Sequence, residues 1–163
     1  MSKKRDEIFG ELMEQIDEAY DLMSDYDAIP HNYGGDEYLY QSESQIIHVV
    51  GDHPGITARE LSDLIRKTPS FCSQNIKKLR AKGYIEQTKN KYNAREYLLQ
   101  LTEKGREMYA EHRDFEQRCL QRTLGNLSGF SDDELRRFID IQKKINETFA
   151  LDVGESRKEL RPW

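Results

Sequence analysis

Apolar residues recur at spacings of three and four along residues 8–26, with polar residues at the positions between them. This period predicts one long helix with a narrow apolar stripe, made by Ile8, Leu12, Ile16, Ala19, Met23 and Tyr26. A narrow stripe on a polar helix needs a partner surface to cover it. Pro30, Asn32, Gly34 and Gly35 then interrupt the pattern and predict a loop.

Two capping-box patterns mark the helices that follow this loop. Ser42, with Gln45 three residues later, predicts the start of a short buried helix that ends near Gly51. Thr57 and Glu60 repeat the spacing and predict a second helix, whose inward side carries Ala58, Leu61, Leu64 and Ile65. Two short helices therefore follow each other closely.

A third helix is predicted from Thr68, because Pro69 then occupies the first helical position, where a missing N–H costs nothing. Its inward residues are Cys72, Ile76 and Leu79. Its other faces carry hydroxyl, amide, aromatic and lysine side chains, namely Ser70, Phe71, Ser73, Gln74, Lys77 and Lys78. Such groups can bind base edges and phosphates, and an aromatic ring can contact a thymine methyl group.

A basic hairpin is predicted after Gly83, which has the position of a helix C-cap. Residues 84–88 and 95–101 have the composition of two strands. The connection between them is polar and carries Lys89 and Lys91, with Arg95 at its end. A cationic hairpin of this kind can straddle a DNA backbone or place an arginine in the minor groove.

Two further amphipathic helices are predicted beyond Thr102, which caps the first of them. Apolar positions of that helix continue through Gly105, Met108, His112, Phe115 and Cys119, and Leu120, Leu124 and Leu127 extend them. Ser131 with Glu134 starts the last helix, one face of which holds Leu135, Phe138, Ile139, Ile145 and Phe149. Together with residues 8–26, these helices have more apolar surface than one small module can cover.

The charge of the chain is unevenly distributed. The 163 residues carry a formal net charge of −5, which alone argues against a nucleic-acid partner. Residues 56–106, however, hold twelve Lys or Arg against five Asp or Glu, a balance of +7, so the rest of the chain carries −12. A basic module on acidic helical flanks can turn its basic face toward DNA.

Composition also excludes several classes of protein. No apolar run approaches the roughly 20 residues that a membrane span needs, and acidic residues stand where a signal peptide would be apolar, so we expect a cytoplasmic protein. Cys72 and Cys119 lie far apart and form no metal-binding pattern. The sequence holds no Gly-rich phosphate loop or nucleophile elbow, and we expect neither enzymatic activity nor a cofactor.

The stretches ITARELSDLI, SFCSQNIKKLRAKGYIEQ and REYLLQLTEKG resemble the winged helix-turn-helix of the multiple-antibiotic-resistance regulator (MarR) family, across residues 42–112. The resemblance implies a mainly α fold with a small β wing, flanked by dimerisation helices. It implies that Ser70, Phe71, Ser73, Gln74 and Lys78 face the major groove of double-stranded DNA. It further implies phosphate contacts for Thr57, Arg66 and Lys67, and the role of wing arginine for Arg95.

Two residues depart from the family pattern. The family often has an aspartate two residues before the wing arginine, where this chain has Asn93. Phe71 replaces the small polar residue that is usual at its position, so the bases read cannot be inferred from the family. The resemblance predicts one MarR-like domain over residues 1–163, with a DNA-binding lobe at 42–101, dimerisation helices in 1–41 and 102–149, and a tail at 150–163.

A homodimer would bury the surplus apolar helix faces and place two reading helices on successive major grooves, about 34–36 Å apart. The alternative is a monomer in which these helices cap the module. We expect a repressor that binds a pseudo-palindromic operator and is released by a small ligand. A winged-helix protein-interaction module without DNA binding is the second interpretation.

The signal to which such a regulator responds is less determined. A small aromatic ligand could bind among Tyr20, Tyr26, Tyr33, Tyr38 and Tyr40, although tyrosines at helical spacing more often pack in cores. A metal-responsive regulator is another hypothesis, because His112 and Glu116 are spaced i, i+4, and His31 or Glu43 could approach them. His48 lies in an apolar run and is expected in the core. Cys72 is interpreted as a small buried hydrophobe rather than a redox sensor.

Overall fold

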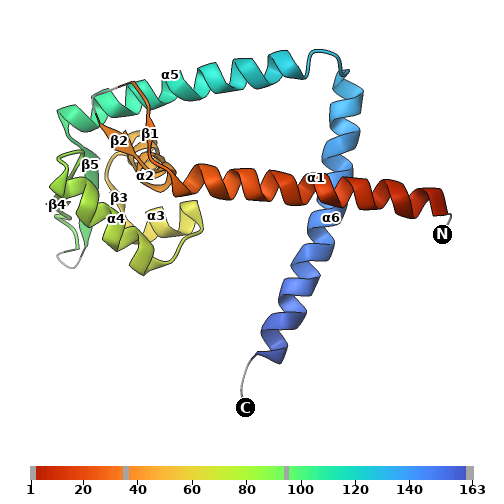
Figure 1. The fold of residues 1–163 in the computed structure, drawn as a ribbon. Helices are drawn as coiled ribbons and strands as arrows, with labels where there is room; N and C mark the ends of the chain where they lie inside the picture. The colour runs from red at the N-terminus through yellow and green to blue at the C-terminus, as the bar shows by residue number, and fades with distance from the viewer. Residues whose placement is uncertain (1–2, 35–36, 94–95, 161–163) are drawn as a thin grey trace. The chain divides into compact units, whose positions relative to one another are not determined.

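The computed structural model describes residues 3–34, 37–93 and 96–160. The chain divides into two compact units, Met1–Gln117 and Arg118–Trp163. Figure 1 shows the elements of the first unit, from α1 into α5, and those of the second, the end of α5 and α6.

The long first helix that the sequence predicts is α1, Lys3–Ala28. None of its residues is fully buried, and the stripe residues Leu12 and Ile16 are half-buried, whereas Ile8 and Met23 are exposed. The stripe that sequence periodicity indicates is therefore largely uncovered within the single chain.

The predicted loop after α1 contains a short antiparallel hairpin, β1 (His31–Asn32) and β2 (Tyr38–Leu39). Between and within these strands the side chains of Tyr33 and Leu39 are buried in the core. Each strand has only two residues, too few to show the alternation that sequence patterns detect. The hairpin brings this segment down onto the rest of the first unit.

The helix α2, Gln41–Asp52, starts earlier than the sequence predicts, so the expected cap at Ser42 with Gln45 is wrong. Tyr40 is the N-cap, and its backbone N–H donates to Oε2 of Glu43 at 3.1 Å. Glu43, rather than Gln45, occupies the third helical position, where a carboxylate can return to the backbone of the cap. Ser42 lies within the first turn instead of before it.

The caps predicted for the next two helices are confirmed. The helix α3, Ala58–Ile65, begins after Thr57, which forms a capping box with Glu60, and α4, Pro69–Ala81, begins after Thr68. The expected inward position of Leu64 is wrong, because its side chain is 55% exposed. Ser62 is buried instead, and its hydroxyl donates to the carbonyl of Lys67 at 2.7 Å, so the inward face of α3 is rotated toward Ser62.

Three antiparallel strands form the sheet of the first unit, in the order β3–β5–β4. The two strands predicted from sequence are β4, Ile85–Lys89, and β5, Tyr97–Leu101. A third, β3, Ile56–Thr57, pairs with β5 through the register Ile56 to Leu99 and was not predicted. It follows Gly55, whose φ of +88° allows the chain to turn into the sheet.

The core of the first unit lies where α2, α3 and α4 pack against this sheet, as Figure 1 shows. The apolar side chains predicted on the inward face of α4 are all buried there. The core also contains Ile46, Ile47, Val50, Leu61, Tyr84, Leu99 and Met108. Packing of this kind holds α4 at a fixed orientation and leaves its opposite face exposed.

The last two helices are α5, Glu103–Asn126, and α6, Asp132–Glu159. The predicted capping box of α6 is confirmed, since Ser131 accepts from the N–H of Glu134. The helix α6 continues ten residues past 149, so the prediction of a tail from residue 150 is wrong as far as residue 159. Residues 150–159 contain no proline, and Arg157 and Lys158 in the last turn favour a helix C-terminus. No residue of α6 is buried.

Candidate nucleic-acid interface

The turn between α3 and α4 is held by backbone and capping bonds. Arg66 ends α3 in the left-handed conformation, with a φ of +54°, and the N–H of Lys67 donates to the carbonyl of Ser62 at 3.2 Å. The hydroxyl of Thr68 accepts from the N–H of Phe71 at 3.2 Å. Arg66 and Lys67 therefore lie exposed in a tight turn at the amino-terminal end of α4.

The two faces of α4 differ completely in chemistry. Cys72, Asn75, Ile76 and Leu79 are buried. On the other side, the exposed residues of the predicted reading surface are Ser70, Ser73, Gln74, Lys77 and Lys78. The helix contains no Asp or Glu in its 13 residues, so its outer face presents hydroxyls, an amide and cations without a carboxylate.

Phe71 is less available for contact with bases than the sequence predicts. Its side chain is half-buried against the core, and Nζ of Lys67 lies 5.8 Å from the centroid of its ring. The ring thus packs partly on the lobe and has a cation near its face. The buried Asn75 was missed by sequence reasoning. Its side-chain amide donates to the carbonyl of Phe71 at 2.9 Å and ties the first two turns of α4 together.

The predicted wing is the hairpin of β4 and β5. Lys89 ends β4 opposite Tyr97, and Lys89 and Lys91 are both exposed. Asn93 is exposed, and its carbonyl accepts from the N–H of Glu96 at 3.0 Å. Arg95, the predicted wing arginine, lies outside the described residues.

The hydroxyl of Thr57 is already engaged in the capping box. It donates to Oε2 of Glu60 at 2.8 Å and accepts from the N–H of Glu60 at 3.2 Å. The Thr57 N–H donates to the same carboxylate oxygen at 2.8 Å, and this bond, together with the one from the hydroxyl, holds the pKa of Glu60 below its usual value. A phosphate contact predicted for Thr57 would therefore compete with a local bond that starts α3.

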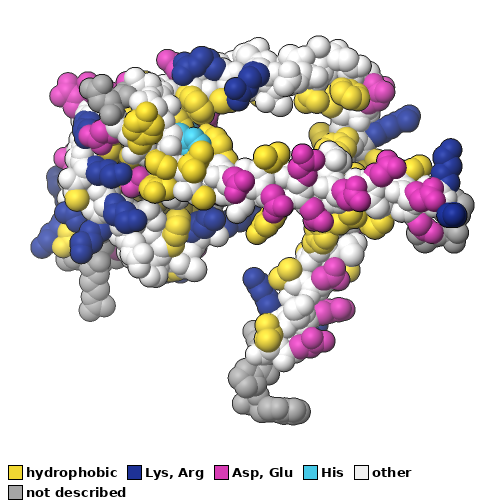
Figure 2. Space-filling view, in the orientation of Figure 1, with side chains coloured by type: hydrophobic (Ala, Val, Ile, Leu, Met, Phe, Trp, Pro, Cys, Tyr) yellow, Lys and Arg dark blue, Asp and Glu magenta, His cyan; other side chains and the backbone are white. Residues whose placement is uncertain are grey.

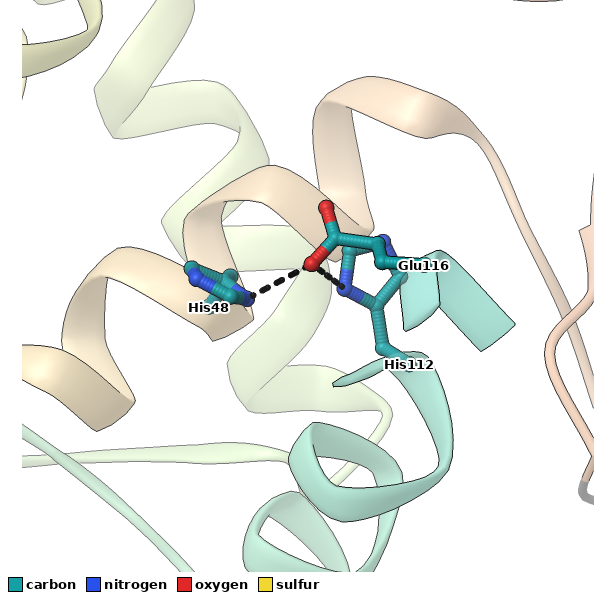
Figure 3. Close-up of side chains that lie close together, drawn as sticks. All are labelled: His48, His112 and Glu116. Atoms are coloured by element: carbon teal, nitrogen blue, oxygen red, sulfur yellow. Dashed lines mark ion pairs between the residues drawn. The ribbon is translucent and has the colours of Figure 1, made fainter. Parts of the chain in front are cut away.

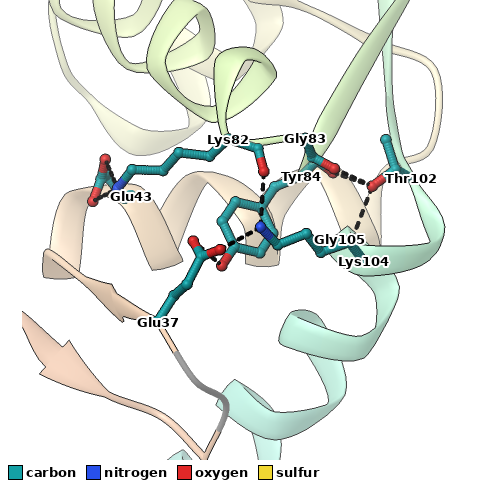
Figure 4. A network of polar contacts seen from close by, with 8 residues as sticks. All are labelled: Glu37, Glu43, Lys82, Gly83, Tyr84, Thr102, Lys104 and Gly105. Atoms are coloured by element: carbon teal, nitrogen blue, oxygen red, sulfur yellow. Dashed lines mark hydrogen bonds and ion pairs between the residues drawn. The ribbon is translucent and has the colours of Figure 1, made fainter.

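Two lysines of the basic segment are neutralised by acids from earlier in the chain (Figure 4). Nζ of Lys82, at the end of α4, lies 2.9 Å from Oε1 of Glu43, and Nζ of Lys104 lies 2.5 Å from Oε1 of Glu37. Lys104 also donates to the carbonyl of Lys82 at 2.9 Å, and the Tyr84 hydroxyl donates to Glu37 at 2.8 Å. This network joins the start of α5 and the end of α4 to residues 37–43.

The basic and acidic side chains segregate over different elements (Figure 2). Lys and Arg gather over the lobe that holds α3, α4 and the hairpin, whereas Asp and Glu line α1 and, separately, α6. The exposed cations at the reading end of the lobe include Arg66, Lys67, Lys77, Lys78, Lys89 and Lys91. Clustered exposed cations are the electrostatic requirement for phosphate contacts.

The tyrosines suggested for a ligand pocket are not gathered around a cavity that the structure shows. Tyr20, Tyr38 and Tyr40 are exposed, and the ring of Tyr26 stacks on His31 with 3.8 Å between centroids. Tyr33 is buried, and burial raises its pKa to about 12. The two cavities described lie elsewhere, around Pro54 at the end of α2, with Tyr109 lining one and His53 the other.

A cluster of three potential metal ligands lies between α2 and α5 (Figure 3). Nδ1 of His48 lies 3.6 Å from Oε2 of Glu116, and Nδ1 of His112 lies 3.8 Å from the same oxygen. The expectation that His48 is a core residue is wrong: it is only half-buried and faces α5, because α2 turns this position toward Glu116. His31 and Glu43 do not join the cluster; His31 binds the carbonyl of Tyr26, and Glu43 binds Lys82.

The two histidine nitrogens that point into this cluster lack hydrogen bonds. Nδ1 of His48 and Nδ1 of His112 are buried atoms without a hydrogen-bond partner among the described residues. The other ring nitrogen of His48 lies 3.1 Å from Oδ2 of Asp52, and Oδ1 of the same carboxylate accepts from the Tyr109 hydroxyl at 2.5 Å. Burial lowers the pKa of His112 and so favours its neutral imidazole. The charge of Glu116 acts in the opposite direction but is the smaller effect.

Cys72 has the environment of a structural residue. Its side chain is fully buried, and burial raises the pKa of its thiol, with a smaller opposite effect from Ser62. A buried thiol of raised pKa is a poor nucleophile.

Along the described part of the chain, no helix is both long and apolar enough to cross a membrane.

The arrangement of α2, α3 and α4 with a β4–β5 hairpin defines a winged helix-turn-helix protein. The model of the MarR family matches residues 40–96, which run from the start of α2 to the end of the hairpin loop. Over this segment the chain is therefore similar to the DNA-binding part of MarR-family regulators.

Individual proteins are similar to the chain over a longer stretch. The chain is 24% identical over 116 residues to the HTH-type transcriptional regulator YhjH of Bacillus subtilis; the match covers 69% of this chain and 66% of that protein, just under two thirds. Among solved structures it is similar to FabT of Streptococcus pneumoniae in complex with DNA, with a TM-score of 0.68 and 21% identity. The match covers 89% of this chain and 99% of the FabT chain. It is also similar to the zinc-responsive ZitR of Lactococcus lactis, with a TM-score of 0.74 and 16% identity. This match covers 87% of this chain and 99% of the ZitR chain. These likenesses show a shared fold.

Proposed function

We propose that the chain is a homodimeric, sequence-specific DNA-binding regulator that inserts α4 into the major groove of an inverted-repeat operator. The outer face of α4 carries this proposal: Ser70, Ser73, Gln74, Lys77 and Lys78 are exposed together on a helix that contains no carboxylate. A helix that serves only as packing would normally pair its lysines with acids on its solvent face. Here the lysines are left to a partner that supplies negative charge.

Contacts to the DNA backbone are proposed for the turn before α4 and for the hairpin. Arg66 and Lys67 lie exposed beside the amino-terminal end of α4, and Lys89 and Lys91 lie exposed at the end of β4. Arg95 is proposed as a further wing contact on the sequence resemblance alone. The main-chain N–H of Thr57 and its hydroxyl are used in the capping box, so we assign Thr57 a positioning role for α3.

The dimer is proposed from the apolar surfaces that each unit leaves uncovered. In α1, Ile8, Phe9, Leu22 and Met23 are each more than half exposed, and in α6 the same holds for Phe138 and Leu151. Apolar surface of this extent on amphipathic helices is a mark of an interaction site. We assign residues 42–101 to the DNA-binding lobe and the flanking helices, now including residues 150–159, to dimerisation.

Selection of bound sequences from a random duplex pool tests this proposal directly. We expect an inverted repeat, because twofold symmetry presents two copies of α4 about 34–36 Å apart. Affinity for the selected sequence should fall steeply with salt concentration. Recovery of no sequence, or binding that salt does not change, would support instead a winged-helix module that binds protein.

Two substitutions then separate base reading from backbone binding. Gln74→Ala should relax discrimination at one position in each half-site, whereas Lys78→Ala should weaken binding to all sequences and reduce the salt slope by about one. Lys104→Ala is a matched control, since Lys104 is paired with Glu37 rather than exposed on α4. If Gln74→Ala and Lys78→Ala bind the operator and random duplex as the parent does, the assignment of α4 to the groove is wrong.

A second function, regulation by a divalent metal ion, is favoured by the cluster of His48, His112 and Glu116 (Figure 3). In a tetrahedral zinc site with bonds of about 2.0–2.1 Å, neighbouring ligand atoms are roughly 3.4 Å apart. The distances of 3.6 and 3.8 Å from Glu116 to the two histidines are close to this value. The ligand atoms of the three residues all lie within 4.8 Å of one another.

The environment of the cluster also fits a cation. The unpartnered Nδ1 atoms of both histidines would act as ligands, and Asp52 on the far side of the His48 ring would orient it, as carboxylates do for metal-bound histidines. Glu116 is half exposed, which leaves a side for a fourth ligand from solvent. The cluster joins α2 of the DNA-binding lobe to α5, so occupancy can change how the lobe is held. ZitR, whose fold is similar, is described as zinc-responsive.

Competition with a chromophoric chelator measures the affinity of the purified chain for zinc. We expect 1:1 binding per chain, a loss of roughly tenfold or more in His112→Ala and in Glu116→Gln, and no change in His53→Gln, an exposed histidine at the end of α2. Operator DNA and zinc should alter each other's affinity by the same factor. Equal zinc affinity in the parent and in both ligand variants would exclude this site.

A further inference from the structure

The tip of the β4–β5 hairpin carries a fully exposed aromatic side chain. Tyr92 is 99% exposed, the highest value among the large hydrophobic and aromatic residues of the described chain, compared with 73% for Tyr20. Such a ring contributes nothing to the core of the lobe. Its exposure instead leaves both its face and its hydroxyl available to a partner.

The hairpin tip holds this residue in a defined turn. The N–H of Tyr92 donates to Oδ1 of Asn90 at 2.9 Å, and the N–H of Asn90 donates to the carbonyl of Glu96 at 3.0 Å. The side chain of Asn90 also binds the carboxylate of Glu96, at 3.3 Å. The tip is therefore closed across the hairpin by two separate bonds, and the ring of Tyr92 extends from it.

The charge beside Tyr92 identifies the kind of partner. Lys91 directly precedes Tyr92, Lys89 lies three residues before it, and both are exposed, so the tip presents two cations and one aromatic ring on a narrow hairpin. A cationic, narrow element fits the minor groove, where narrow A·T tracts concentrate negative potential. The groove floor at A·T pairs shows acceptors alone, adenine N3 and thymine O2, whereas G·C adds the protruding amino group of guanine.

We propose that Tyr92 enters the minor groove at the flanks of the operator and donates its hydroxyl to acceptors at A·T pairs, which makes it a specificity-determining residue. The tyrosine hydroxyl is a hydrogen-bond donor, and its ring can pack on the sugar walls while the adjacent lysines meet the phosphates. At a G·C pair the guanine amino group occupies the groove floor and leaves the hydroxyl without room for this bond. This inference rests on the proposed DNA-binding function and adds a base preference outside the sites read by α4.

The test uses the selected operator with its flanks varied as A·T, G·C or inosine·C pairs, in fluorescence anisotropy titrations. Inosine·C lacks the guanine amino group, so its minor groove resembles that of A·T while its major groove resembles that of G·C. We expect the parent to bind A·T and inosine·C flanks alike and G·C flanks about fivefold more weakly. Tyr92→Phe should bind all three alike, at the level of the G·C flank.

Control variants separate this role from charge and from folding. Lys91→Gln should weaken binding to all three flanks equally and reduce the salt slope, and Tyr97→Phe, from the start of β5, should leave the flank preference intact. Thermal unfolding of Tyr92→Phe should match that of the parent. A flank preference that persists in Tyr92→Phe, or a parent that binds inosine·C like G·C, overturns the proposal for Tyr92. A parent that selects no operator at all overturns the proposed function instead.

Discussion

Oε1 of Glu43, in the first turn of α2, lies 2.9 Å from Nζ of Lys82, the residue that ends α4 (Figure 4). Glu43 is almost completely buried, and its other carboxylate oxygen accepts from the N–H of Tyr40. One carboxylate therefore starts α2 and anchors the carboxyl-terminal end of the proposed reading helix. Lys82 is basic but is committed to this bond, which removes it from the set of cations that can meet DNA.

Glu43→Gln should destabilise the lobe by about 1–2 kcal/mol, because a hydrogen bond to a charged group is lost and Lys82 is left without its counter-charge. The loss of stability should not be larger, because Lys82 is partly exposed and water can solvate its charge. Urea unfolding measures the change, with Lys77→Gln as a control for loss of an exposed lysine on the same helix. Equal unfolding midpoints for parent and Glu43→Gln would show that the pair adds nothing to stability.

Gly105→Ala should be strongly destabilising, by more than about 2 kcal/mol. A Cβ atom at this position would lie 2.0 Å from the carbonyl oxygen of Tyr84, which is backbone and cannot move aside cheaply. That carbonyl also accepts from the N–H of Thr102, so the contact fixes the start of α5 on the lobe. This explains physically why glycine ends the LTEKG segment.

Gly125→Ala is the matched control for that substitution. Gly125 belongs to the same helix, and a Cβ there meets nothing within 4 Å, so stability should be unchanged or raised by up to about 1 kcal/mol. Thermal or urea unfolding of both variants measures the two changes in stability. Similar stability losses at positions 105 and 125 would attribute the effect to glycine in general rather than to the carbonyl of Tyr84.

Tyr33→Phe should flatten the dependence of stability on alkaline pH. Burial raises the pKa of Tyr33 to about 12 from the usual 10, so the neutral phenol favours the folded state. Its contribution is complete below pH 10 and is lost as pH rises through 12. Urea unfolding at pH 9 and at pH 11 measures this; the parent should lose more stability between them than Tyr33→Phe. An equal loss in both proteins would contradict the assignment.

Phe138→Asp should separate the proposed dimer into monomers. Phe138 is 55% exposed on α6, and an aspartate there would place a charge in the apolar surface that we assign to the partner. Sedimentation at micromolar concentration measures the mass, and the unfolding temperature of the parent should rise with concentration while that of the variant does not. Lys144→Gln, at an exposed position on the polar side of α6, is the control and should remain dimeric. A parent that sediments as a monomer would favour the helical-cap interpretation.

Local patterns predicted most of the helices correctly because their signals lie within a few residues. The capping boxes of Thr57 with Glu60 and of Ser131 with Glu134 involve groups three residues apart, and each is present. The buried face of α4 was predicted for the same reason, since its spacing follows the helical period. The start of α2 was wrong because its N-cap is Tyr40, a residue type that the usual cap pattern of Ser, Thr, Asp or Asn does not include.

The predicted site was only partly accessible to local reasoning. Exposure of the polar face of α4 follows once its apolar face is assigned, and this was predictable. The His48 cluster was not, because an apolar run around His48 predicts a core residue, whereas α5 brings His112 and Glu116 beside it. A single histidine on α2 and an i, i+4 pair on α5 do not predict a metal site separately. They form one only when the two helices pack together.

The sequence by itself determined the class of fold, the caps of α3, α4 and α6, the buried face of α4, and the basic character of residues 56–106. Tertiary structure alone decided which of those basic residues remain available, since Glu43 and Glu37 take up Lys82 and Lys104. It also decided that His48 meets Glu116 and that Tyr92 lies in solvent. The physical reason is range: helix caps and periodic faces are set by neighbours in the chain, whereas charge pairing and ligand clusters depend on distances between elements that only packing defines.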